Sequence, residues 1–440
     1  MYFYLNAAGI RLDNKGYKQG EMKRKLLGIV AILGFGLALS ACSNTPAPVE
    51  QGASDGSDAG EPENNGEPAT KTGSYTIKVY DIDDEVLGEK TVSIEDYPVF
   101  IDGLNANFDA VLGSSSYGSY PISINGSVVD DPNWYMASYE NGEYCLTSLE
   151  GLVVDDGDLF EFKVTCSNEV GNGYDGTMDS YDVLVDKTIY HYAKTYMKAA
   201  LESSSSSSYT GSKYWEDMII YQMLLNGYDY NVFGSVHHTR EFMDSVSNAD
   251  VSTLSGNNVF KWFYAARILG LNLDSYKTKY KAVLESTTTF NAFSTSFLIG
   301  PAKYFELESS INSSVINTES KGSGDGLCWA LTGLSMYKTF DNSELDALPI
   351  ADTGNKNNAT NLALRLLPYA AFNVNVRTKK NTDNKDILEL LFDNYYDSDL
   401  MLVKYREADT ADNMSTNQIY ASLVAYKLQR DKKKAVSIFA

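Results

Sequence analysis

The residue types that most often carry out nucleophilic or metal chemistry are scarce in this chain of 440 residues. The histidines are His191, His237 and His238, and the cysteines are Cys42, Cys145, Cys166 and Cys328. The adjacent His237 and His238 could bind a metal ion, but a histidine pair followed by Thr239-Arg240 is more typical of a solvated loop. Carboxylates are numerous but scattered, and they form no recognisable acid–base pair. The sequence therefore provides no complete catalytic set and no metal site, and it requires no cofactor.

Cys42 follows a segment with the features of a signal peptide. Basic residues from Lys23 to Lys25 precede an apolar run from Leu26 to Leu39, which is shorter than the roughly 20 residues of a membrane-spanning helix. The run ends in Leu39-Ser40-Ala41-Cys42, which resembles the bacterial lipobox. The resemblance implies that residues 1–41 are removed, with Met22 as the true start, and that Cys42 carries lipid. An ordinary signal peptide followed by a chance cysteine is the alternative.

The other cysteines are open to a structural interpretation. Cys145 and Cys166 could form a disulfide if their strands are neighbours, or they could be buried free thiols. Cys328 lies in an apolar stretch, where a core position is more common than a nucleophile.

Two short patterns resemble parts of known active sites. Asp81-Ile82-Asp83-Asp84 matches the acid motif of class II terpene cyclases, whose middle carboxylic acid protonates an alkene. Here the motif falls between two predicted strands, so we interpret it as a turn that water reaches. Asp325 and Cys328 resemble the first two zinc ligands of protein prenyltransferases, but every histidine lies upstream of them, so that site is not completed.

The charge of the chain excludes several partners. The formal net charge is −22, and it becomes −26 once residues 1–41, with six basic and two acidic side chains, are removed. Such a surface repels nucleic acid and anionic lipid.

Composition and periodicity divide the remaining chain. Residues 42–73 contain almost no large apolar side chain, which indicates a flexible tether after the lipidated cysteine. Residues 74–166 predict strands at Tyr75–Tyr80, Val86–Ile94 and Leu159–Val164, a helix at Pro98–Leu112 and a hairpin turn at Asn141-Gly142. One helix among several strands indicates a small α+β domain.

Residues 167–179 form a predicted linker, and residues 180–440 have helical periodicity. Apolar residues recur at helical spacing from Leu327 to Tyr337, from Ala363 to Ala370 and from Ile387 to Leu391, and Asn258 to Leu269 is apolar almost all round. Apolar helices close at Gly227 and again at Gly270, 43 residues later, and at irregular intervals after that. Such a period is typical of stacked helix pairs. Ser415 or Thr416 is the expected N-cap of the last helix.

The order of these segments carries a family resemblance. Tyr117 to Tyr120 before Ile124-Asn125-Gly126, then Trp134-Tyr135 and Asp155 to Asp158, are similar to the β-domain, a β-grasp-like fold, of the cobalamin carriers transcobalamin and intrinsic factor. Residues 412–426 resemble the last helix of the α/α toroid family, which includes terpenoid cyclases and the α-domain of the same carriers. The resemblance implies a toroid of six helix pairs over residues 180–440, although the carriers have the two domains in the opposite order.

Aromatic side chains, 12% of the residues, are the best candidates for binding. The candidate ligand-binding residues are Tyr117, Tyr120, Trp134, Tyr135, Trp262, Trp329 and Tyr337. The resemblance implies a non-catalytic receptor of the cell surface that holds cobalamin or another corrinoid between its two domains. A surface adhesin for glycan or protein is the alternative, and a toroid-type enzyme is less favoured.

Overall fold

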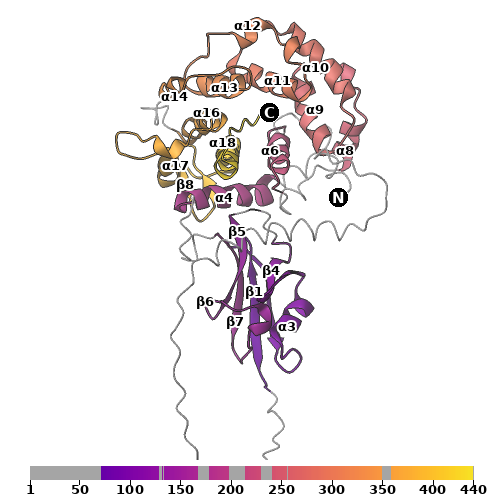
Figure 1. Cartoon of the computed structure of the whole chain (residues 1–440), viewed down its shortest axis with the longest axis vertical. Helices are drawn as coiled ribbons and strands as arrows, with labels where there is room; N and C mark the ends of the chain where they lie inside the picture. The colour runs from indigo at the N-terminus through magenta and orange to yellow at the C-terminus, as the bar shows by residue number, and fades with distance from the viewer. Residues whose placement is uncertain are drawn as a thin grey trace, which may run out of the picture.

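The computed structural model describes residues 71–127, 131, 133–166, 178–197, 214–228, 240–254, 256–348 and 358–439. Strands and one helix make up the part up to Cys166, which we call the strand region, and helices dominate from Ser180 onward, in the helical region. Figure 1 shows the strand region below and the helical region above it. The lipobox with Cys42, residues 42–70 of the predicted tether, residues 167–177 of the predicted linker and His237-His238 lie outside the described residues.

The strand region is a mixed sheet with one helix beside it. Its elements are β1 (Ser74–Tyr80), β2 (Val86–Ser93), α3 (Phe100–Asn107), β3 (Ala110–Ser115), β4 (Gly118–Ile124), β5 (Trp134–Glu140), β6 (Glu143–Tyr144), the 3₁₀ turn η2 (Leu149–Gly151) and β7 (Leu159–Cys166). The main sheet has the order β2-β1-β7-β5-β6, in which only β1 and β7 run parallel, and β3 and β4 form a separate hairpin.

Alternation of side chains fixes which face of the sheet is buried. Tyr75, Ile77 and Val79 point into the core while their neighbours do not, as the period of a half-buried strand requires. Phe100 of α3 packs on Phe160 of β7, with ring centroids 4.4 Å apart. The helix therefore covers this face and completes a small hydrophobic core.

The strand predictions and the hairpin turn are confirmed, but the predicted helix is too long. Asn141 and Gly142 both have positive φ, as a tight two-residue hairpin turn requires. The helix from Pro98 to Leu112 instead ends at Asn107, and strand β3 begins at Ala110. Pairing of Val111 with Ser123 in the β3–β4 hairpin overrides the apolar spacing that predicted a longer helix.

The helical region follows in many short elements. They are α4 (Ser180–Tyr192), the π-helical turn η3 (Ala193–Met197), α6 (Tyr214–Leu225), α8 (Arg240–Ser247), η4 (Val251–Thr253), α9 (Gly256–Ile268), α10 (Asp274–Ser286), α11 (Ala292–Tyr304), η5 (Glu308–Ser310), α12 (Ser313–Ile316), α13 (Asp325–Leu334), α14 (Ser343–Asp346), α15 (Ala359–Ala363), α16 (Leu366–Ala371), η7 (Val376–Thr378), α17 (Ile387–Tyr395), β8 (Tyr396–Asp397), β9 (Leu402–Val403) and α18 (Asn413–Lys432).

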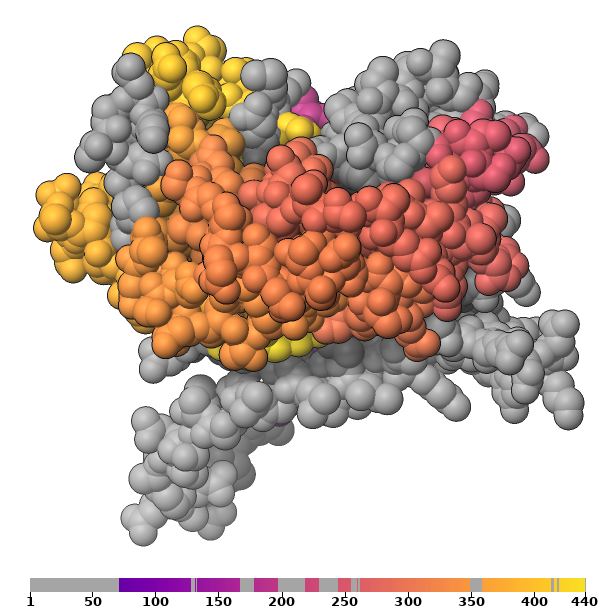
Figure 2. Space-filling view, turned by 90° about the horizontal axis from the view of Figure 1, so that it is seen from above, coloured from indigo at the N-terminus to yellow at the C-terminus, as the bar shows by residue number. Residues whose placement is uncertain are grey.

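These helices are arranged as an arc around α18. Figure 1 shows α8 to α17 following one another along the arc, with α18 inside it. Seen from the helical end, the same segments cross the face as a continuous band from red through orange to yellow (Figure 2). Helix α18 contacts α4, α6, α15 and α16, and most of its described side chains are buried. Its position explains why the apolar residues of α18 are not confined to one face.

Helix ends in this region agree with the repeat in the sequence. Gly227, Gly270 and Asn373 each follow a helix and have positive φ, the backbone conformation that commonly ends a helix. The expected N-cap of the last helix is wrong, because the Asp412 carboxylate caps α18 by accepting from the Ser415 backbone N–H. The Thr416 hydroxyl instead donates to the Asp412 carbonyl and accepts from Val403 N–H.

The architecture is thus a small α+β region followed by a helical region. Among the residues that the structure describes, none of the helices is both long enough and apolar enough to cross a membrane. Cys145 and Cys166 are free thiols. A disulfide is excluded because β5 separates them: Cys166 lies opposite Trp134, whereas the Cys145 N–H bonds to Ser138, four residues further along β5.

Candidate functional site

A buried ion network joins the strand region to the helices. The Lys427 side chain of α18 is fully buried, and its Nζ lies 2.7 Å from Asp131, 2.9 Å from Asp186 and 3.0 Å from Asp431. Asp131 precedes β5, Asp186 lies on α4 and Asp431 lies one turn after Lys427 on α18. The Lys427 ammonium therefore joins α18 to α4 and to the segment before β5, which are distant from it in sequence.

Further donors complete this buried ion network. Arg430 pairs with both oxygens of Asp186 at 2.9 and 3.0 Å and with Asp431 at 2.8 Å. The Trp134 indole N–H donates to Asp186 at 2.9 Å, the Tyr190 hydroxyl donates to Asp131, and the Tyr228 hydroxyl donates to Asp431. Buried carboxylates are stable only when their oxygens are paired and hydrogen-bonded in this way.

The electrostatics keep most of this network charged. Burial opposes ionisation of Asp431, but Lys427 and Arg430 outweigh it and lower the pKa of that carboxyl. Burial also opposes the charge of Lys427, while Asp131, Asp186 and Asp431 raise the pKa of its ammonium. Complete burial raises the pKa of Asp186 in spite of both cations. A lysine held protonated is a poor nucleophile and a poor base, so the geometry suits fastening rather than catalysis.

A second contact between the two regions involves the carboxylates of the Asp81–Asp84 turn. Asp83 is buried, and its carboxylate meets His191 Nδ1 at 2.7 Å and also pairs with Lys194 of the π-helical turn η3. Lys194 also pairs with Asp81 and Glu85.

The interpretation of the Asp81–Asp84 segment as a turn is confirmed by the positive φ of Asp84, but the expectation that water reaches all of it is wrong for Asp83. Burial alone would raise the pKa of Asp83, yet the hydrogen bonds from His191 and Lys194 lower it. An ionised carboxylate cannot serve as the acid of an alkene cyclase.

The third feature is a guanidinium enclosed by aromatic rings, which we call the aromatic cage. Arg267 of α9 is only 6% exposed. Its Cζ lies 3.5 Å from the ring centre of Tyr221, 4.0 Å from that of Tyr304 and 4.9 Å from that of Phe263. Rings at these distances attract a cation through their negative faces. Burial lowers the pKa of Arg267 below its usual range.

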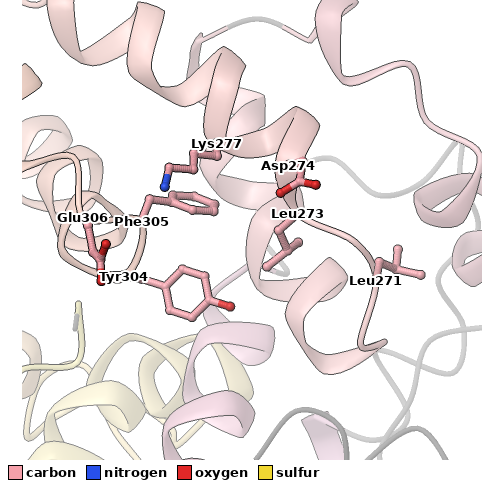
Figure 3. A pocket seen from close by; sticks show the side chains of 7 residues that line it. All are labelled: Leu271, Leu273, Asp274, Lys277, Tyr304, Phe305 and Glu306. Carbon is pink, nitrogen blue, oxygen red and sulfur yellow. The ribbon is translucent and has the colours of Figure 1, made fainter. Parts of the chain in front are cut away.

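A surface hollow of about 330 Å³ adjoins this aromatic cage, near the lower end of the roughly 300–1,000 Å³ of ligand pockets. It is lined by Leu271, Leu273, Asp274, Lys277, Tyr304, Phe305 and Glu306 (Figure 3). The lining comes from the segment that links α9 to α10, from the first turn of α10, and from the end of α11 with the two residues after it. Tyr304 belongs to both features, because its ring lies over Arg267 and its side chain lines the hollow.

The aromatic residues expected to bind ligand are not gathered in one place. Tyr117 is 67% exposed at the β3–β4 turn, and Tyr120 follows it on β4. Trp134 is buried in the ion network described above, and burial raises the pKa of the Tyr135 hydroxyl.

The three expected residues of the helical region have separate packing roles. Trp329 of α13 packs among Phe293, Phe297 and Phe439. Tyr337 donates its hydroxyl to the Ile299 carbonyl, and Trp262 is a partly buried residue of α9 at the edge of the core. None of the seven lines the hollow.

The sequence contained a signal for the groups that were missed. Lys427, Asp186 and Arg267 are buried charged residues that directly follow apolar residues in their helices. Buried charges are rare unless they are paired or functional. These interruptions of short apolar runs could have marked the three side chains as candidates, although not their partners. In the described part of the chain, no cluster of three or more His, Cys, Asp or Glu side chains could hold a metal ion.

Comparisons with known proteins add little to this geometry. No protein-family model and no curated protein sequence matches the chain. Among solved structures, a putative metal binding protein from Ruminococcus gnavus is 22% identical, and the match covers 22% of this chain and 98% of the other at a TM-score of 0.19. A TM-score of this size supports no conclusion about fold or function.

Proposed function

We propose that this chain is a non-catalytic binding protein of a bacterial cell surface, anchored by lipid on Cys42, with its ligand site at the hollow beside α9, α10 and α11. The observation that carries the proposal is the composition of the hollow: apolar side chains, aromatic rings and charges of both signs converge on one concave surface. Such a mixture is typical of sites that bind small molecules. The buried ion network keeps the strand region in place beside the helices.

The helical region in this proposal is an α/α toroid of six helix pairs. The arc of helices around α18 (Figure 1) and the positive-φ residues after successive helices support it. A corrinoid is the ligand that the resemblance to cobalamin carriers implies. The hollow is too small to enclose a corrin ring, so a corrinoid would bind with one edge or side chain inserted there.

The test of this proposal uses the full chain with Cys42→Ala, mixed with cobalamin or cobinamide and passed through a desalting column. A carrier retains the visible absorbance of the corrinoid in the protein peak, and the melting temperature rises because the ligand binds only the folded state. A ligand concentration of about 100 μM detects even weak binding. Tyr304→Ala should reduce retention, whereas Trp329→Phe, which is outside the hollow, should not. If neither retention nor a thermal shift is observed, a corrinoid is rejected as the ligand.

A surface adhesin is the second candidate function, favoured by apolar side chains exposed on the strand region. Leu146 is 91% exposed, and Val153, Tyr144 and Tyr117 are also exposed. The Glu150 carboxylate accepts hydrogen bonds from Ser119, which ties the loop after β6 to the β3–β4 hairpin. Loss of glycan or protein binding in Leu146→Ser, with binding kept in Tyr304→Ala, would support this function instead.

Anchoring is tested separately. Cys42→Ala should abolish incorporation of labelled fatty acid, because the thiol is the proposed site of lipid attachment, and it should leave the protein unprocessed or released into the medium. The released fraction is measured by blotting membrane and medium fractions. Fatty acid that is still incorporated by Cys42→Ala would contradict the lipobox interpretation.

A further inference from the structure

Arg267 differs from Arg377 and Arg430, two arginines of the helical region with little exposed side chain. Arg430 pairs with Asp186 and Asp431, and Arg377 pairs with Asp179 and Asp386. Arg267, by contrast, has no carboxylate partner among the described residues: its Nη2 donates to the Tyr221 hydroxyl, and its Nε has no hydrogen-bond partner. Its remaining contacts are with aromatic rings.

Stability alone does not account for this arrangement. Burying a charge without a counter-charge is unfavourable, and leaving a buried donor without a hydrogen bond adds to that cost. Cation–π contacts offset part of it, but an apolar side chain of similar length would fill the space without either cost. A group retained at such a cost is a candidate for binding.

Two unpartnered buried donors lie on the same helix. The Arg267 Nε and the hydroxyl of Tyr264, three residues earlier on α9, are both buried without a hydrogen-bond partner. A carboxylate accepts hydrogen bonds from a guanidinium and from a phenol O–H, so both donors are available to such a ligand.

The adjoining hollow limits the ligand. Asp274 and Glu306 on its lining outnumber the single cation Lys277, so the entrance disfavours a multiply charged anion such as phosphate. Leu271, Leu273 and Phe305 provide apolar surface for the body of a ligand. Tyr304 lies over Arg267 and also lines the hollow, and at 47% exposed it is the member of the aromatic cage that is open to solvent.

We propose that Arg267 recognises a small ligand with one carboxylate and a flat or apolar body, which enters through the hollow when the Tyr304 side chain rotates. This inference rests on the proposed function only in that it uses the same binding site at the hollow; the ligand class differs from a corrinoid, whose side chains are amides. The guanidinium N–H groups bind the carboxylate once the Tyr304 ring has moved aside, and the rings of Tyr221 and Phe263 hold the guanidinium in position.

The experiment compares benzoate with benzamide, its neutral analogue of the same shape, on the full chain with Cys42→Ala. Isothermal titration calorimetry should give an affinity at least tenfold higher for benzoate, and inorganic phosphate should bind no better than benzamide. Arg267→Met should remove this preference, while Lys338→Met, which changes a lysine outside the hollow, should keep it. Equal affinities for benzoate and benzamide, or a preference that survives in Arg267→Met, would overturn the inference.

A control for folding keeps the test decisive. Since Arg267 has no ion pair to lose, Arg267→Met should melt at or above the temperature of the parent protein. If it does not fold, Arg267→Lys replaces it: this variant keeps the charge but loses the planar fork, so benzoate affinity should still fall, and an unchanged affinity would refute the proposal. Corrinoid retention measured on the same preparations separates the two proposals, because it can succeed or fail independently of the preference for benzoate.

Discussion

At the scale of single residues, the buried cations of this protein fall into two groups that differ in the partners that surround them. Lys427 and Arg430 are matched by buried carboxylates, whereas Arg267 is enclosed by rings. The first group stabilises the folded state only as a complete set, because removing one member leaves its partners buried and unpaired. The second group has no such partner to leave behind, so substitutions at the two places should have opposite effects on stability.

Lys427→Met should lower the free energy of unfolding by about 3–5 kcal/mol, the range for breaking a buried ion pair. Asp131 would lose its ammonium partner in the interior, and Asp186 would keep Arg430 as its single cation. The measurement is urea denaturation followed by circular dichroism. Lys379→Met is the matched control, because its pair with Asp346 lies at the surface and should contribute about 0–1 kcal/mol. Similar losses in the two variants would contradict the importance of the buried ion network.

Asp83 predicts a pH dependence of stability. Its folded pKa is held below the ordinary value of 3.8 by His191 and Lys194, although burial acts against them. A carboxyl with a lowered folded pKa contributes its full stability above the unfolded pKa, near pH 4, and loses it as the pH falls through the folded value. The melting temperature should therefore fall below about pH 4 more steeply in the parent protein than in Asp83→Asn. Parallel pH profiles for the two proteins would show that this ion pair contributes nothing.

At the scale of elements, local signals were sufficient where the determining contacts are local. Alternation along Tyr75–Tyr80 and the Asn141-Gly142 turn predicted a strand and a hairpin that the structure confirms. The helix predicted from Pro98 was too long, because the strand that replaces its end depends on pairing with Gly118–Ile124. Likewise, Ala363 to Ala370 has helical spacing but forms two short helices, α15 and α16.

The cap of α18 provides a test of an element boundary. Asp412→Ala should reduce the free energy of unfolding by about 0.5–2 kcal/mol, because the Ser415 N–H loses its acceptor at the helix start. Ser415→Ala is the matched control from the same turn: its hydroxyl is buried without a hydrogen-bond partner, so its removal should cost less. Chemical denaturation of both variants gives the comparison. A larger loss in Ser415→Ala would restore the cap expected from the sequence.

At the scale of the whole molecule, the decisive contacts join residues that are distant in sequence. Lys427 and Asp131 are 296 positions apart, and Lys194 and Asp83 are 111 apart. No local pattern reports such pairs, so the sequence could indicate that two regions exist but not that ion pairs would hold them together. The candidate site was missed for the same reason, since the aromatic cage forms only when α6, α9 and α11 meet and the hollow only when α10 meets the end of α11.

Because of these contacts, we expect the strand region and the helical region to stay associated after the chain is cut between them. Proteolysis is expected to cut first in residues 43–73 and then near residues 167–179, leaving fragments of roughly 90 and 260 residues. A site for a specific protease inserted within residues 167–179 would make the second cut complete. The two fragments should still elute together in gel filtration, because Asp131 of the smaller fragment remains paired with Lys427 of the larger one.

Salt and substitution together distinguish a buried junction from a surface one. Surface ion pairs are screened at about 1 M salt, where the Debye length is about 3 Å, whereas fully buried pairs are screened much less. The cut protein should therefore stay associated at high salt, and Lys427→Met should release the smaller fragment under the same conditions, whereas Lys379→Met should not. Fragments of the parent protein that separate at low salt would show that the buried ion network does not hold the regions together. Separation only at high salt would instead place the stabilising charges at the solvent-exposed pairs, such as Lys187 with Asp84, and the junction would then be a reversible contact.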